Sequence, residues 1–82
     1  MENNIRVSWN KTIRTYHLGA TANKGSRIKA TNGEHSIVVP YDSAVSGDEN
    51  HMFACRALLK KLEWEGAWIG GEIRNGYIFV ME

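Results

Sequence analysis

The stretch SRIKATNGEHSIVVPYD, residues 26–42, decides the fold. Two β-prone runs flank Asn32-Gly33, and an Asn-Gly pair in that position predicts a β-hairpin with a type I′ turn. The turn sets three pairs: Ala30 with His35, Ile28 with Ile37, and Ser26 with Val39. These residues share the core face, whereas Arg27 and Lys29 fall on the other face. Pro40 ends the second strand because it has no backbone donor.

Residues 67–81, AWIGGEIRNGYIFVM, repeat the pattern with Asn75-Gly76 as the turn. The predicted pairs are Ile73 with Ile78, Gly71 with Val80, and Glu72 with Phe79. One face then holds Ile69, Ile73, Ile78 and Val80. The other face holds Trp68, Tyr77, Phe79 and Met81, together with Glu72 and Arg74. Gly70-Gly71 indicates a bulge or a close backbone approach.

Residues 49–64, ENHMFACRALLKKLEW, have the period of an amphipathic helix. Ser46 and Glu49 form a capping box before it, and we expect its end at Glu63 or Trp64. Its wide apolar arc contains His51, Met52, Ala54, Cys55, Leu58, Leu59 and Leu62.

The N-terminal part of the chain predicts a further strand. Ile5, Val7 and Trp9 alternate with polar residues, and residues 10–18 continue in an extended manner. The whole chain, residues 1–82, is therefore expected to form a single α+β domain. Its predicted architecture is an antiparallel β-sheet with one α-helix packed across it, in the order β-β-β-α-β-β.

The net charge of the 82 residues is only +1, but it is unevenly distributed. Residues 1–31 hold six basic residues and one acid, Glu2, whereas residues 32–82 hold four basic and eight acidic residues. This asymmetry predicts a basic face that could meet nucleic acid or an acidic protein. Interleaving of strands from both halves is the alternative, and it would cancel much of the asymmetry.

The single cysteine excludes an internal disulfide and fits a reducing, cytoplasmic compartment. The sequence has no apolar run of the length that a membrane span needs, and no signal-peptide pattern, so we expect no contact with a membrane. Because so short a chain buries a modest core, a partner is expected, and a second copy forming a homodimer is one candidate.

His51 lies inside the apolar arc of the predicted helix, and three interpretations compete. It could be a structural residue whose ring bonds a backbone carbonyl or Asp42. Cys55, one turn further on, could instead make it half of a zinc site or the base beside a thiol nucleophile. The zinc site lacks a second ligand pair, and a reactive thiol requires exposure. We therefore expect the structural role, with no catalytic residue, metal or cofactor.

The residues that folding leaves unexplained are aromatic and basic. Trp68, Tyr77 and Phe79 on one hairpin face, beside Arg74, have the composition of a protein-binding surface. Arg27 and Lys29 add positive charge and could also serve single-stranded nucleic acid. Coverage of the aromatic face by the N-terminal segment, through Trp9 or Tyr16, is the alternative to exposure. The predicted partner-binding residues are Arg27, Lys29, Arg74, Trp68, Tyr77 and Phe79.

Several blocks of the chain carry a resemblance that covers about residues 15–80. These blocks are Thr21 with Ser26 to Ala30, Pro40 to Asp42, Glu49 to His51, and Gly76 to Val80. They resemble small uncharacterised proteins carried by bacteriophages, plasmids and other mobile elements. The resemblance also implies that Arg27, Tyr41, Asp42, Asn50 and His51 meet at one corner, which they would either fix or use for recognition.

Short proteins of mobile elements often act by blocking a host component. The resemblance therefore implies a non-enzymatic module that inhibits a host defence complex, of the anti-CRISPR or anti-restriction type, in a bacterial cytoplasm. The alternative is a small nucleic-acid-binding protein that uses the basic N-terminal half.

Overall fold

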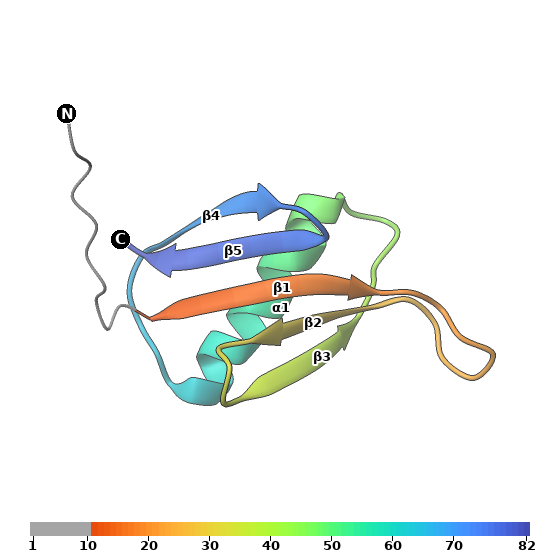
Figure 1. Cartoon of the computed structure of the whole chain (residues 1–82), viewed down its shortest axis with the longest axis horizontal. Coiled ribbons are helices and arrows are strands. Elements are labelled where there is room, and N and C mark those ends of the chain that lie inside the picture. The colour runs from red at the N-terminus through yellow and green to blue at the C-terminus, as the bar shows by residue number, and fades with distance from the viewer. Residues whose placement is uncertain (1–10) are drawn as a thin grey trace.

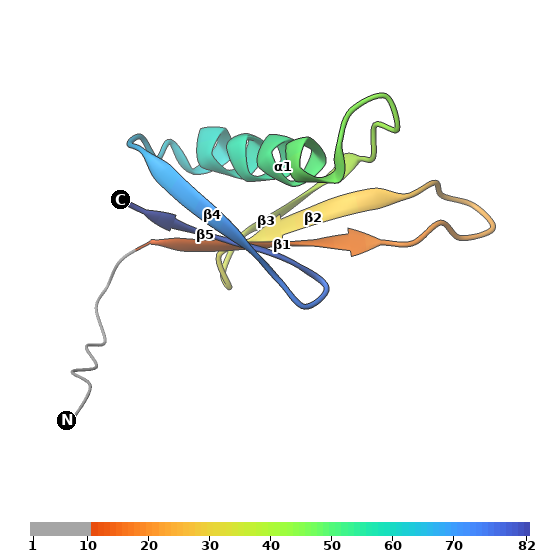
Figure 2. The same ribbon diagram turned by 90° about the horizontal axis from the view of Figure 1, so that it is seen from above.

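The computed structural model describes residues 11–82, so the strand predicted for residues 5–9 lies outside the described residues. The elements are β1 (Thr12–Leu18), β2 (Arg27–Thr31), β3 (Ser36–Pro40), α1 (Gly47–Leu62), β4 (Trp68–Ile73) and β5 (Gly76–Met81). The strands form one antiparallel sheet in the order β3-β2-β1-β5-β4, and α1 crosses one of its faces (Figures 1 and 2). The predicted α+β architecture and element order are confirmed.

The helix begins where the capping pattern predicts. Ser46 is the N-cap, and its Oγ accepts a hydrogen bond from the backbone N–H of Glu49 at 3.2 Å. Asp48 and Glu49 in the first turn, and Lys60 and Lys61 in the last, complement the helix dipole.

The helix ends slightly earlier than expected. Glu63 adopts a left-handed conformation with φ 58°, and the helix proper stops at Leu62. The backbone N–H of Glu63 donates to the carbonyl of Lys60 and that of Trp64 to the carbonyl of Leu59. This pair of bonds is a Schellman motif, which closes the helix without a glycine at the left-handed position.

The core lies between α1 and the sheet. From the helix, Ala54, Cys55 and Leu58 are buried, as the predicted arc requires. They pack on buried apolar residues that β1, β2 and β5 contribute: Ile13, Ile28, Ala30 and Phe79. Met52, on the margin of the arc, remains 40% exposed.

The register of the β2–β3 hairpin differs from the prediction by two residues. Ile28 pairs with Val39 and Ala30 with Ile37, so Gly33-Glu34 rather than Asn32-Gly33 occupies the tip. The side chain of Asn32 is the reason, because its Oδ1 accepts from the backbone N–H groups of Glu34 (2.9 Å) and His35 (2.7 Å). A slip of two residues preserves the faces, so Ile28 and Ala30 still point to the core.

The register of the β4–β5 hairpin also differs by two residues, but in the opposite direction. Ile73 pairs with Gly76, which leaves Arg74-Asn75 at the tip, with Asn75 at φ 71°. Gly76 instead lies within β5, where a β-carbon would overlap the backbone carbonyl of Thr15 on β1. A close approach of two strands, rather than the turn, therefore requires this glycine.

The sheet face opposite α1 is covered by no element of residues 11–82, and we call it the open face (Figure 2). It follows from strand alternation and the registers. Its residues are Thr12, Arg14, Tyr16, Leu18, Arg27, Lys29, Thr31, Ser36, Val38, Pro40, Ile69, Gly71, Ile73, Gly76, Ile78 and Val80.

Candidate interaction surfaces

Three of the predicted contact residues lie on the helix side of the sheet, in or against the core, rather than on an exposed surface. Phe79 is 7% exposed and belongs to the core, and Trp68 and Tyr77 are half-buried against it. The Trp68 ring also stacks on Trp64 with 6.1 Å between centroids. The prediction of an exposed aromatic face on this hairpin is therefore wrong. Among the described residues, α1 packs on this face. Tyr16 lies on the opposite face of the sheet and does not cover it, and Trp9 lies outside the described residues.

The reason for this inversion lies in the neighbouring strand. Ile13 on β1 pairs with Phe79, and Thr15 pairs with Tyr77, so the aromatic side of β5 continues the buried side of β1. On β4, Gly70 pairs with Phe79 and leaves the space that the aromatic ring fills. The bulge or close backbone approach predicted at Gly70-Gly71 is not what the structure has: the ladder continues through both residues, and the group that approaches Gly70 is the Phe79 side chain.

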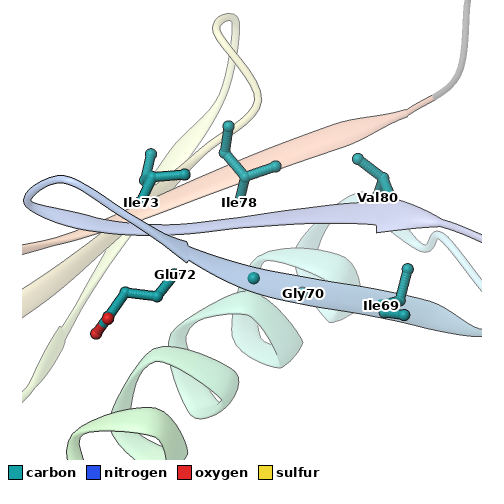
Figure 3. Close-up of a pocket in the computed structure, with 7 residues that line it drawn as sticks. Ile69, Gly70, Glu72, Ile73, Ile78 and Val80 are labelled. Carbon is teal, nitrogen blue, oxygen red and sulfur yellow. The ribbon is translucent and has the colours of Figure 1, made fainter.

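The aliphatic set of the same hairpin forms one end of the open face. Figure 3 shows Ile69, Ile73, Ile78 and Val80 projecting to the side away from α1, whereas Glu72 projects towards the helix side. The four aliphatic side chains line a shallow apolar depression of about 340 Å³, and Ile69 is 55% exposed. The exposed hydrophobic surface of this hairpin is therefore aliphatic.

The basic residues occupy the middle of the open face. Arg27 and Lys29 lie there on β2, as predicted, and Arg14 joins them from β1. Tyr16 lies between them, because it pairs with Lys29 and follows Arg14 by two residues. Among residues 11–82, no carboxylate lies on this face.

Two residues of this surface, Arg14 and Tyr16, were not among the predicted contact residues. Arg14 and Tyr16 alternate with the buried Ile13 and Thr15, and this alternation was the signal that could have placed them beside Lys29. Arg74, by contrast, lies exposed at the tip of the β4–β5 hairpin, away from the other predicted cations.

His51 has the structural role expected of it, with a different partner. It is 7% exposed, and its Nδ1 is hydrogen-bonded to the hydroxyl of Thr15 at 2.7 Å. Its ring also packs on Tyr77, with 4.5 Å between centroids. Burial, followed by the nearby charge of His17, lowers the pKa of His51. A lowered pKa favours the neutral ring, which links β1 to α1.

Asn50 fixes the corner where β3 leads into the helix. Its Oδ1 accepts from the backbone N–H of Asp42 at 2.7 Å, and its Nδ2 donates to the carbonyls of Asp42 (2.8 Å) and Ser46 (3.0 Å). Asn50 is 2% exposed, so these bonds replace water completely. Asp42 therefore meets Asn50, not His51, and contributes through its backbone.

A second polar group surrounds Tyr77. Its hydroxyl donates to Oδ1 of Asp48, and it lies 3.5 Å from Oε2 of Glu72. The bond to Asp48 is the main cause that raises the pKa of Tyr77 to about 12, and Glu72 adds to it. The phenol thus stays protonated between two carboxylates.

The alternative chemical roles of Cys55 and His51 find no geometric support. Burial raises the pKa of the Cys55 thiol to about 11, so the thiolate that a nucleophile requires is suppressed. In residues 11–82 there is no cluster of three His, Cys, Asp or Glu side chains that could hold a metal ion.

Comparison with known proteins adds no family assignment: no family model, no curated protein and no solved structure matches the chain. Within residues 11–82, α1 is neither long nor apolar enough to cross a bilayer.

Proposed function

We propose that the protein is a non-enzymatic binding module whose open face contacts a protein partner. The observation that carries the proposal is the composition of this face, which places exposed aliphatic side chains beside Arg14, Arg27 and Lys29 with no carboxylate among the described residues. A partner with an apolar patch bordered by acidic residues is complementary to it.

A protein partner agrees better with this face than nucleic acid does. Sheets that bind single strands stack bases on several aromatic side chains, and Tyr16 is the one aromatic residue among those of the open face. Ile69 and Val38, by contrast, are 55% and 44% exposed at opposite sides of the sheet. Large exposed aliphatics on two margins are typical of a surface that another protein covers.

The biological role we propose is inhibition of a host defence complex, such as a CRISPR effector or a restriction enzyme. The resemblance of residues 15–80 to proteins of mobile elements supports it. In this role the module acts by occupying a surface of the complex, and it requires neither a cofactor nor a catalytic residue of its own.

The test is recovery of the partner from a bacterial lysate with tagged protein. We expect the wild type to retain a stable protein partner, and we expect Arg14→Glu and Lys29→Glu to lose it, because each reverses a charge on the open face. Lys60→Glu is the matched control, since Lys60 is exposed on α1 and lies on the opposite side of the molecule. Recovery of nucleic acid without a protein would overturn the proposal, as would equal loss in all three variants.

Nucleic-acid binding is the second candidate, and the position of Tyr16 between Arg14 and Lys29 favours it. Each phosphate that a cation neutralises releases counterions, so the affinity must fall steeply as salt rises. A titration with single-stranded DNA and RNA at about 50 mM salt tests this candidate. Absence of binding at that concentration removes it.

A further inference from the structure

A groove lies between α1 and β4 on the helix side of the sheet. Among the described residues, α1 packs on β1, β2, β3 and β5 but not on β4. Two adjoining depressions, of about 250 and 190 Å³, share Met52, Trp68 and Phe79 as lining residues. Figure 2 shows the start of β4 close to α1 and the hairpin tip sloping away from it. The groove therefore lies along the edge strand and has an apolar floor.

Within residues 11–82, the outer edge of β4 pairs with no other strand and leaves backbone groups free beside this groove. The N–H of Glu82 donates to the carbonyl of Ala67 at 2.9 Å, which fixes Ala67 as a residue whose backbone points towards β5. Because hydrogen bonding alternates along an antiparallel ladder, Trp68, Gly70 and Glu72 direct their N–H and C=O groups away from β5. The strand contains no proline or lysine, the residues that commonly protect an edge.

The groove is also electrically polarised. Asp48 lines it at one end, where Glu72 and the hydroxyl of Tyr77 meet it. Arg56 lines the other end. An extended segment lying along β4 would thus meet carboxylates near Glu72 and a cation near Trp68.

We propose that the edge of β4 binds an extended peptide segment by strand addition, and that the segment carries a Lys or Arg two positions before an apolar residue. In an antiparallel strand, the apolar residue lies opposite Gly70. With no side chain at Gly70, it packs on the ring of Phe79 and on Met52. The basic residue, about 7 Å further along, reaches Glu72 and Asp48. This site is separate from the open face and does not depend on its function.

A second copy of the chain is a poorer occupant. Pairing of two β4 strands that preserves the faces presents Trp68, Gly70 and Glu72 of each copy to the groove of the other. β4 of a second copy brings no basic side chain to Asp48 and Glu72, because its residues on this face are Trp68, Gly70 and Glu72. A segment with a Lys or Arg at that position complements the two carboxylates, and β4 of a second copy does not.

The test is a titration of the isotope-labelled full chain with synthetic peptides, followed by NMR chemical shifts. The probe is acetyl-Thr-Lys-Thr-Val-Thr-Thr-amide, and we expect shifts confined to β4 and the facing side of α1. Replacing its Lys by Glu should weaken binding about fivefold or more. Glu72→Gln should lower the affinity for the lysine peptide, whereas the matched control Glu34→Gln, in the distant β2–β3 turn, should leave that affinity unchanged.

Backbone methylation of the peptide distinguishes strand addition from simple adsorption. The residue opposite Gly70 directs its N–H towards β4, so N-methylation of the valine should abolish binding, and N-methylation of the threonine before it should not. Absence of shifts at a few millimolar peptide, equal effects of the two methylations, or equal binding of the glutamate peptide would each overturn the proposal. Shifts of β4 that depend on protein concentration without peptide would assign the edge to a second copy instead. We expect Arg14→Glu, on the open face, to bind the peptide as the wild type does. This control separates the test of the β4 edge from the test of the open face.

Discussion

The hydroxyl of Thr15 and Nδ1 of His51 lie 2.7 Å apart in the interior, and this bond joins the central strand to the N-terminal half of the helix. Both residues are almost wholly buried. If one of the two side chains were removed, water could not easily take its place as a hydrogen-bond partner, so the other would be left unpaired in the interior.

We expect His51→Ala to lower the free energy of unfolding by about 1–3 kcal/mol, through loss of the buried bond and the cavity left by the ring. Chemical denaturation measures it. Thr15→Val removes the other partner, and the double variant should cost less than the sum of the two single changes. Partner binding should persist in folded His51→Ala. An unchanged denaturation midpoint with lost binding would identify His51 as a contact residue instead.

The stability of the protein should also depend on pH through His51. Burial and the charge of His17 lower its pKa in the folded state, against the opposing effect of Asp48 and Glu72. The unfolded chain, with a histidine pKa of about 6.5, therefore takes up a proton first as the pH falls. The contribution of neutral His51 is present above about pH 6.5 and is lost as the pH falls below that value.

Denaturation of the wild type and of His51→Ala at about pH 7.5 and pH 5.5 separates this effect from other titrations. The wild type should lose more stability between the two values than the variant does. Equal losses would mean that His51 has the same pKa in the folded and unfolded states.

The sequence predicted the elements because their signals are local, and it misplaced the registers because those depend on particular side chains. Two Asn-Gly pairs located both hairpins. The amide of Asn32 moves the tip of the first turn by one residue, which changes the strand register by two. Close contact with β1 explains why the position of Gly76 in β5 requires a glycine. Since a slip of two residues preserves the faces, the predicted core of β2 survived the error.

Which face of the last hairpin is buried could not be decided from alternation alone. Both faces carry large apolar side chains, aromatic on one and aliphatic on the other. A period of two residues separates the two sets but does not show which of them is buried. The pairing of Ile13 with Phe79 decides that the aromatic face is buried, and these two residues are 66 positions apart in the chain. Alternation therefore could not show that Trp68, Tyr77 and Phe79 lie on the helix side of the sheet. Arg27 and Lys29 were placed correctly on the face away from the helix, because their hairpin has only one strongly apolar face.

The two adjacent glycines of β4 should respond differently to alanine. A β-carbon at Gly70 would overlap Cδ1 and Cε1 of the Phe79 ring, whereas one at Gly71 meets nothing within 4 Å. Because Phe79 is held in the core, we expect Gly70→Ala to destabilise the fold by about 1–3 kcal/mol. Gly71→Ala, the matched control, should change stability by less than about 0.5 kcal/mol. Thermal denaturation of the two variants checks this, and equal midpoints would contradict the tight packing at Gly70.

Asn50 and Asp42 are joined through the side chain of Asn50 and the backbone of Asp42, so substitution of the two side chains should have unequal effects on stability. The Asn50 side chain supplies three buried hydrogen bonds, to the backbone of Asp42 and of Ser46. The Asp42 side chain makes one exposed bond, to the backbone N–H of Ala44. Asn50→Ala removes three hydrogen bonds and takes away the partner of the Asp42 backbone N–H, whereas the carbonyls of Asp42 and Ser46 still accept from backbone N–H groups. We expect it to lower the free energy of unfolding by about 2–4 kcal/mol, whereas Asp42→Ala should cost less than about 1 kcal/mol. Urea denaturation of both variants decides it, and a larger loss for Asp42→Ala would show that the carboxylate, not the amide, fixes this corner.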